Sequence, residues 1–167
     1  MKKENTEAVR RLYAGAIALM DGEEDGSRSF VDLLKEMLDA PGAFEHILEA
    51  HVRPTMAQLR GQILEKKVKT AFDFVGEEEG IVSMIKDAVL ENAWNICLFL
   101  AEEKDQELVI FSEFRNGIYG KGYRNGESWD RPRQTHDGFL TILKRDGNSV
   151  RLLTAYPVKD FADFEKR

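Results

Sequence analysis

The 167-residue sequence contains a single cysteine, Cys97, so no disulfide can form within the chain. The sequence also lacks a Cys-x-x-Cys pair or a Cys/His group with the spacing of a zinc site. Cys97 lies in the apolar run Ile-Cys-Leu-Phe-Leu. We therefore expect it to be a core residue rather than a ligand or a redox centre.

Long hydrophobic runs are also absent, because none approaches the roughly 20 apolar residues that a membrane-spanning helix needs. The apolar segment 14–20 is short and follows two glutamates and two arginines, which is typical of an amphipathic helix rather than of a signal peptide. We expect a protein that does not contact the membrane. We also expect it to be soluble and made in the cytoplasm.

Several sequence motifs for bound groups are missing. Neither HExxH nor HxxxH occurs, and no second carboxylate-rich cluster accompanies the histidines. Neither GxGxxG nor GxxxxGK[ST] occurs, although residues 117–126 are rich in glycine. The sequence therefore predicts no metal site, no cofactor and no nucleotide cradle.

Basic residues are few but unevenly distributed. The net charge is −6, which by itself argues against a polyanionic substrate. Residues 1–114 carry 13 basic and 23 acidic side chains, and residues 115–167 carry 11 basic and 7 acidic ones, so the last third is net +4 and the remainder net −10. This asymmetry is compatible with a local anion site and equally with a solvated strand face.

The pattern of apolar residues predicts helices first and strands last. Helical spacing is found at 9–20, 30–38, 44–48 and 56–63, and a long helix begins among Glu77–Glu79 and carries apolar residues to Leu100. Thr55 and Gln58 have the spacing of a capping box that starts the 56–63 helix. We expect an N-terminal helical extension at 1–40 and a domain at 41–167, the whole forming one compact unit.

Strand patterns begin after Glu102. They cover 107–111 and 117–120, and a long loop is expected at 121–133. A hairpin is predicted from strands at 138–144 and 149–156, joined by a turn at 145–148. The fold class is therefore α+β, with N-terminal helices followed by a twisted antiparallel β-sheet.

The three histidines are candidates for acid/base chemistry, because imidazole titrates near neutral pH without special tuning. His46 and His51 are about 140° apart on an ideal helix, so they are not expected to share a face. His51 lies at a helix end before Arg53-Pro54, and His136 lies in the basic loop. A surface or capping role remains open for each.

Thr154 and Tyr156 lie two residues apart on a predicted strand, so both hydroxyls should be on the same face. Arg151 would face the other side. The two hydroxyls could bind a phosphate, and a packed tyrosine beside a solvated threonine is the alternative.

Three segments, in this order, resemble the bacterial RNase A-like toxin domains found at the C-termini of CdiA contact-dependent growth inhibition proteins. The first is His46-Ile-Leu-Glu-Ala-His51-Val followed by a helix that begins near Thr55. The second is Thr70-Ala-Phe-Asp73, and the third is the closing hairpin that ends in Leu-Leu-Thr-Ala-Tyr-Pro157. The resemblance covers residues 43–158.

This resemblance implies an RNase A-like toxin fold and a metal-independent endoribonuclease that cleaves RNA, with tRNA a frequent target. It also implies a neutralising immunity protein, and delivery as part of a secreted toxin that acts in the cytoplasm. The residues that match the catalytic motif are His51, Arg60, Thr154 and Tyr156. The residues that we expect to contact the substrate are His46, Arg53 and Lys144.

Two alternatives to a ribonuclease remain. One is a catalytically inactive relative that keeps the fold and binds RNA or a protein. The other is an immunity or antitoxin protein, which an acidic surface would suit.

Overall fold

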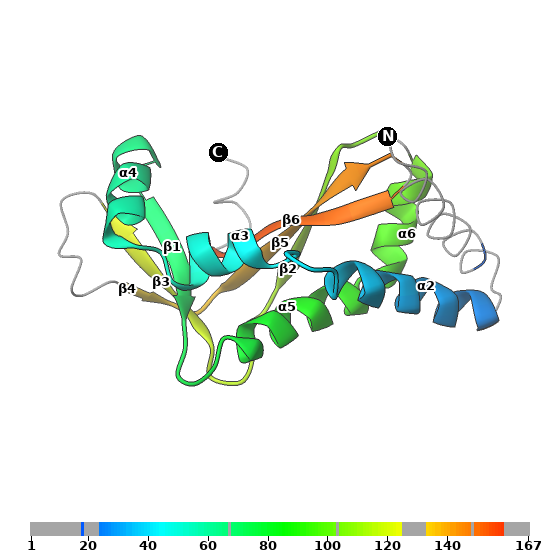
Figure 1. Ribbon diagram of the computed structural model, residues 1–167, viewed down its shortest axis with the longest axis horizontal. Coiled ribbons are helices and arrows are strands. Elements are labelled where there is room, and N and C mark those ends of the chain that lie inside the picture. The colour runs from blue at the N-terminus through cyan, green and yellow to red at the C-terminus, as the bar shows by residue number, and fades with distance from the viewer. Residues whose placement is uncertain are drawn as a thin grey trace. The chain divides into compact units, whose positions relative to one another are not determined.

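The computed structural model describes residues 18, 24–66, 68–102, 104–124, 133–147 and 149–158. The helix predicted at 9–20, most of the predicted loop at 121–133 and Asn148 in the predicted turn lie outside these residues. The described elements are α2 (Glu24–Leu38), α3 (Glu45–Ile47), the π-helical turn η1 (Leu48–Val52), α4 (Met56–Lys66), β1 (Val68–Asp73), α5 (Glu79–Glu91), α6 (Ala93–Glu102), β2 (Glu107–Ser112), β3 (Tyr119–Arg124), β4 (Arg133–Thr135), β5 (Gly138–Asp146) and β6 (Ser149–Val158). Figure 1 shows them in order of colour along the chain.

The strands form two three-stranded sheets, in the orders β1-β3-β4 and β2-β5-β6. The predicted α+β class, with helices and antiparallel strands, is confirmed. The sequence predicted one sheet, and β1 falls within the region that was expected to be helical. β1 is a strand because it pairs with β3 in antiparallel register, from Val68 opposite Arg124 to Asp73 opposite Tyr119. The same pairing makes a strand of 121–124, where a loop was predicted.

The contacts divide the chain into two compact units. The first contains the described residues up to Ala43 together with Lys86–Ile110 and Ile142–Leu153, and the second contains Phe44–Ile85, Phe111–Thr141 and the rest from Thr154. Helix α5 and strands β2, β5 and β6 have residues in both units.

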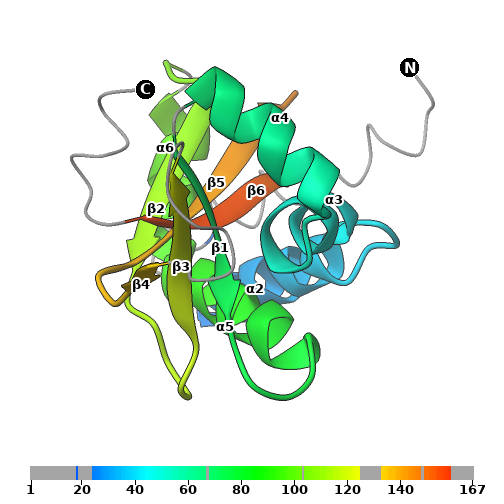
Figure 2. The same cartoon turned by 90° about the vertical axis from the view of Figure 1, so that its left-hand side faces the viewer.

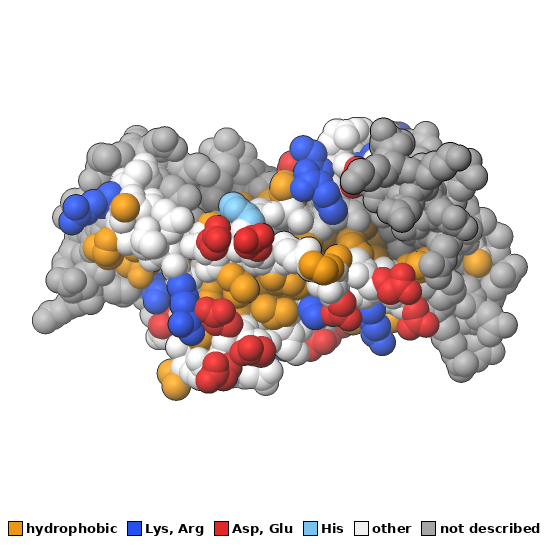
Figure 3. Space-filling model, viewed as in Figure 1, with side chains coloured by type: hydrophobic (Ala, Val, Ile, Leu, Met, Phe, Trp, Pro, Cys, Tyr) orange, Lys and Arg blue, Asp and Glu red, His pale blue; other side chains and the backbone are white. Residues whose placement is uncertain are grey.

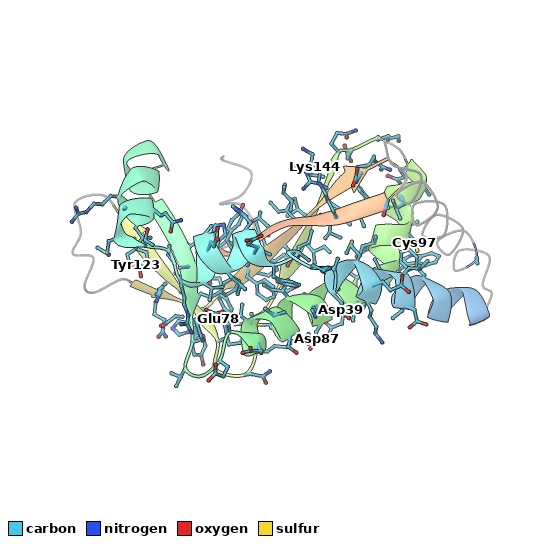
Figure 4. The ribbon with its side chains drawn as sticks, in the orientation of Figure 1. Asp39, Glu78, Asp87, Cys97, Tyr123 and Lys144 are labelled. Carbon is cyan, nitrogen blue, oxygen red and sulfur yellow. The ribbon has the colours of Figure 1, made fainter. Side chains whose placement is uncertain are left out.

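In the first unit, α2 packs on α6. Phe30 and Leu34 of α2 and Ile96 and Cys97 of α6 are all fully buried. Burial raises the pKa of the Cys97 thiol to about 12, so this thiol stays protonated at neutral pH. Cys97, labelled in Figure 4, is a core residue as the sequence predicted.

The helix expected to run from Glu77–Glu79 to Leu100 is interrupted at Asn92, which separates α5 from α6. The Asn92 side-chain amide donates a 2.8 Å hydrogen bond to the carbonyl of Ala88. Asparagine offers the backbone an alternative partner in this way, which is why it interrupts helices.

The predicted turn at 145–148 is shorter than expected, because β5 continues through Arg145 to Asp146. The Arg145 guanidinium donates hydrogen bonds to the carbonyls of Phe99 (2.5 Å) and Asp105 (3.0 Å), and it lies 4.5 Å from the centre of the Phe99 ring. It thus places positive charge at the C-terminal end of α6, where helix carbonyls lack partners.

In the second unit, α4 lies against β1 and β3, as Figure 2 shows from one side. Leu59 of α4, Ala71 of β1 and Tyr123 of β3 form a buried cluster at this contact. On the other side of β1, the centre of the buried Phe72 ring lies 5.9 Å from the centre of the Phe139 ring. The predicted capping box starts α4, because the Thr55 amide donates to Gln58 Oε1 at 2.8 Å and the Gln58 amide donates to Thr55 Oγ1 at 3.2 Å.

Gly120 of β3 is required by close packing. A Cβ built on it would overlap Thr135 Oγ1 and lie 2.6 Å from Pro157 Cβ. We predict that Gly120→Ala lowers the free energy of unfolding by about 1–3 kcal/mol, because the core around it would be overpacked.

Gly61→Ala is the matched control, because a Cβ at this helical position meets nothing within 4 Å. It should raise stability by up to about 1 kcal/mol, since alanine is the better helix former. Urea unfolding followed by circular dichroism measures both. Equal effects of the two substitutions would show that β3 does not lie against Pro157.

Candidate functional site

The candidate site begins at the π-helical turn Leu48–Val52. The Arg53 amide donates to the Leu48 carbonyl at 2.9 Å, five residues back, instead of four as in an α-helix. Residues five apart are brought over one another by such a turn. The rings of His46 and His51 therefore meet edge to face, with 5.8 Å between their centres. The prediction that these histidines do not share a face is wrong, because it assumed α-helical spacing.

The two histidines differ in exposure. His46 is exposed, and His51 is half-buried. Histidine surface lies over α3 among acidic side chains in Figure 3, and the neighbouring Glu45 and Glu49 are both exposed. His46 thus contacts solvent, and His51 faces inward.

His51 contacts Tyr156 of β6. The ring centres are 5.4 Å apart with an angle of 33° between the planes, and Tyr156 is only 6% exposed. From the sequence alone, His51 had only a helix-end position, and the family resemblance was the sole link between it and Tyr156. The structure places the imidazole and the phenol ring side by side.

Thr154, two residues before Tyr156 on β6, has a buried hydroxyl. Its Oγ1 is shielded from solvent and has no hydrogen-bond partner among the described residues. Most buried polar atoms are paired, because leaving one unpaired costs about 1–3 kcal/mol. The hydroxyls of Thr135 and Thr141 are buried in the same way, without a partner in the part of the chain that the structure describes.

The end of β6 is fixed by a buried hydrogen bond from Thr70 Oγ1 of β1 to the Pro157 carbonyl, at 2.6 Å. Gly120 of β3 lies against the Pro157 ring from a third strand. Tyr156 is therefore held in place by the residue that follows it.

The three basic residues predicted for the site occupy different surroundings. Arg60 is exposed on α4, next to Leu59, which packs on β1. Arg53 forms a 2.5 Å ion pair with Glu78 and lies 5.9 Å from the centre of the Phe74 ring, so its charge is partly compensated. Lys144 is half-buried on β5 and belongs to the first unit; both Glu78 and Lys144 are labelled in Figure 4.

A second histidine–tyrosine pair was not predicted. His136, just after β4, contacts Tyr119 of β3 edge to face, with ring centres 4.7 Å apart. The pair forms because β3 and β4 are antiparallel neighbours, with Gly120 opposite Thr135. Tyr119 and His136 are 17 positions apart in the sequence. Their contact could have been predicted only from the register of β3 against β4.

Tyr123 and Asp73 mark the two ends of the α4-side face of the β1-β3-β4 sheet. Burial raises the pKa of Tyr123, and the negative charge of Asp73 raises it further. Asp73 also accepts a 3.1 Å hydrogen bond from the Gln134 side-chain amide. Figure 4 labels Tyr123 beside α4.

The described part of the chain contains no group of three or more His, Cys, Asp or Glu side chains placed to hold a metal ion. No helix within it has both the length and the apolar character needed to cross a membrane.

No family model matches this sequence, and no curated protein matches it. One chain of a crystal structure of a CdiA-CT/CdiI complex from Y. kristensenii 33638 is similar in structure, with 22% sequence identity and a TM-score of 0.49. The match covers 65% of this chain and 94% of that chain. At this identity and TM-score, the likeness assigns neither a family nor an activity to this chain.

The unpaired hydroxyl gives a prediction about stability. Thr154→Val should raise the free energy of unfolding by about 1 kcal/mol, because it removes a buried polar atom that has no partner. Chemical unfolding monitored by circular dichroism measures the change.

Thr70→Val is the matched control, because it removes a hydroxyl that donates to the Pro157 carbonyl. This variant should lose about 1–2 kcal/mol, since it leaves a buried carbonyl without its donor. If Thr154→Val were as destabilising as Thr70→Val, the Thr154 hydroxyl would have to be paired in the free protein.

Proposed function

We propose that this chain is a metal-independent endoribonuclease of the RNase A-like toxin type. Such an enzyme cleaves RNA by attack of a 2′-hydroxyl on the adjacent phosphate, which leaves a 2′,3′-cyclic phosphate. The observation that carries the proposal is the contact of the half-buried His51 imidazole with Tyr156. Thr154, two residues earlier on the same strand, has a buried hydroxyl with no partner among the described residues. The sequence resemblance selects the same three residues.

The reaction needs one group to take the proton from the 2′-hydroxyl and another to protonate the departing 5′-oxygen. His51 takes the first role, because an imidazole can accept a proton near neutral pH. The hydroxyl of Tyr156, whose ring contacts His51, supplies the proton to the leaving oxygen. The 2′-oxygen then forms the new bond to phosphorus as the bond to the 5′-oxygen breaks.

The pentacovalent phosphorane carries negative charge that fixed hydrogen-bond donors stabilise. The Thr154 hydroxyl is suited to this role because it has no competing partner within the described chain. Because this oxygen is shielded from solvent in the free protein, substrate binding would have to open a path to it, and a phosphate oxygen would then supply its missing hydrogen bond.

A cationic side chain would complete the phosphate site. The resemblance assigns Arg60, whose guanidinium can bind two phosphate oxygens at once. Arg53 would have to release Glu78 before it could contact substrate. His46 contacts His51 and is exposed, which suits contact with an RNA strand rather than with the reacting atoms. Lys144 remains a proposed contact to RNA.

The same resemblance implies a biological setting. We propose that the chain acts on RNA, with tRNA as the first substrate to test, in the cytoplasm of a target cell. We also propose that an immunity protein neutralises it. Cells that express the chain without such a protein would then stop growing.

Replacement of His51 gives the sharpest test in solution. His51→Ala should reduce the initial rate of tRNA cleavage about 10²- to 10⁴-fold, because it removes the acid/base group. Tyr156→Phe keeps the ring that contacts His51 and removes only the hydroxyl. The decrease in its cleavage rate therefore measures the contribution of the proton donor alone. Rates are followed by gel electrophoresis in buffer that contains EDTA.

Lys104→Ala, an exposed residue in the first unit, serves as the control and should cleave at the wild-type rate. An unchanged rate for His51→Ala would refute the assignment. Wild-type protein that binds RNA without cleaving it, and that is harmless when expressed in bacteria, would favour the inactive binding relative instead.

A further inference from the structure

The Tyr119–His136 pair lies outside the proposed catalytic group and has no role in it. Tyr119 is 37% exposed, and His136 is exposed. Their rings contact each other edge to face, so part of an aromatic pair is open to solvent.

The Tyr119 ring is connected to the core by a series of aromatic contacts. The centre of the Tyr119 ring lies 6.3 Å from the centre of the Phe114 ring. The Phe114 ring centre in turn lies 5.9 Å from that of Phe139 and 6.5 Å from that of Phe72, and both of these residues are fully buried. The Tyr119 ring is therefore supported by the core of its unit while part of its surface is open to solvent. A ligand that stacks on it would find a preformed surface, so little side-chain entropy would be lost on binding.

Polar groups surround the pair on the same side of the sheet. Lys121 follows Tyr119 by two residues on β3 and is opposite Gln134, which precedes His136 by two residues. Alternate residues of a strand share a face, so all four side chains belong to one face of the β3–β4 pair. The Gln134 amide is held by Asp73 at 3.1 Å, which fixes its orientation.

Lys121 supplies a cation on the face of the β3–β4 pair that carries Tyr119 and His136. The Asp73 carboxylate on this face is bound to Gln134. In the sequence, residues 119–135 carry four basic and two acidic side chains, although the whole chain has a net charge of −6. A cation beside exposed aromatic rings gives the two features of a single-stranded nucleic acid site: a cation for phosphate and ring faces for bases.

We propose that Tyr119 and His136 form a stacking subsite for a nucleobase of single-stranded RNA. This proposal rests on the proposed ribonuclease function, because it names where the substrate strand is held beyond the cleaved bond. Both ring pairs belong to the second unit, and Gly120, next to Tyr119, lies against Pro157, which follows Tyr156.

Binding can be tested separately from cleavage with a fluorescently labelled 2′-O-methyl oligoribonucleotide, which has no free 2′-hydroxyl to attack the phosphate. Fluorescence anisotropy of the full chain measures its dissociation constant. Tyr119→Ala should weaken binding about 10-fold or more, as expected for loss of a base–aromatic stack. Tyr119→Phe keeps the ring and should bind within about 2-fold of the wild type.

His136→Ala is a second variant at an exposed position, so its effect does not depend on the fold tolerating the loss of Tyr119. It should weaken binding in the same direction. A series of oligonucleotides with one abasic nucleotide each should reveal one position where loss of the base weakens binding to wild type but not to Tyr119→Ala. That pattern distinguishes stacking of a base from contact with phosphates alone.

Wild-type affinity in both Tyr119→Ala and His136→Ala, or equal effects of abasic nucleotides on wild type and Tyr119→Ala, would overturn the subsite. The outcome is independent of the catalytic proposal. A protein that binds the oligonucleotide through Tyr119 but does not cleave RNA would keep the subsite and refute the ribonuclease.

Discussion

The hydrogen bond from the Arg53 amide to the Leu48 carbonyl determines the geometry on which the candidate site depends. It widens the last turn of the short helix by one residue, and the chain then leaves the helix because Arg53 precedes Pro54 and has φ −131° and ψ 60°. Without the extra residue in the turn, His46 and His51 would face different directions. With it, His51 lies between His46 on one side and Tyr156 on the other. π-helical turns are rare and occur frequently at functional sites.

A turn of this kind can position His51 only if its partner is equally fixed. Strand β6 meets this need because the residue after Tyr156 is held from two sides, by the hydrogen bond from Thr70 and by the close approach of Gly120. Sites built on strands and helices hold their groups more precisely than sites on loops. On the same strand, the Thr154 hydroxyl is buried without a hydrogen-bond partner among the described residues, which costs free energy of folding.

Local patterns predicted the parts of the fold that depend on neighbouring residues. The capping box at Thr55 and Gln58 requires only residues three apart, and the common face of Thr154 and Tyr156 requires only strand alternation. Strand β1 was missed because its identity comes from pairing with β3, about fifty residues later in the chain. The break at Asn92 was missed because the apolar spacing continues on both sides of it.

The site was predicted less completely than the fold, for the same physical reason. No periodicity links His51 to Tyr156, so the sequence joined them only through a family resemblance, and the π turn that brings His46 to His51 has no signature in helical spacing. The pairing of His136 with Tyr119 depends on the β3–β4 register. Interactions between residues distant in sequence are set by tertiary packing, which residue patterns do not encode locally.

The central claim is that His51, Thr154 and Tyr156 cleave RNA through attack by its own 2′-hydroxyl. Mass spectrometry of the new 3′ ends, after cleavage of a short defined RNA by the wild-type protein, tests it most directly. The account predicts fragments whose mass corresponds to a 2′,3′-cyclic phosphate, with a 5′-hydroxyl on the other product. Fragments that end in a 3′-hydroxyl and begin with a 5′-phosphate would contradict it, because they require attack by water instead.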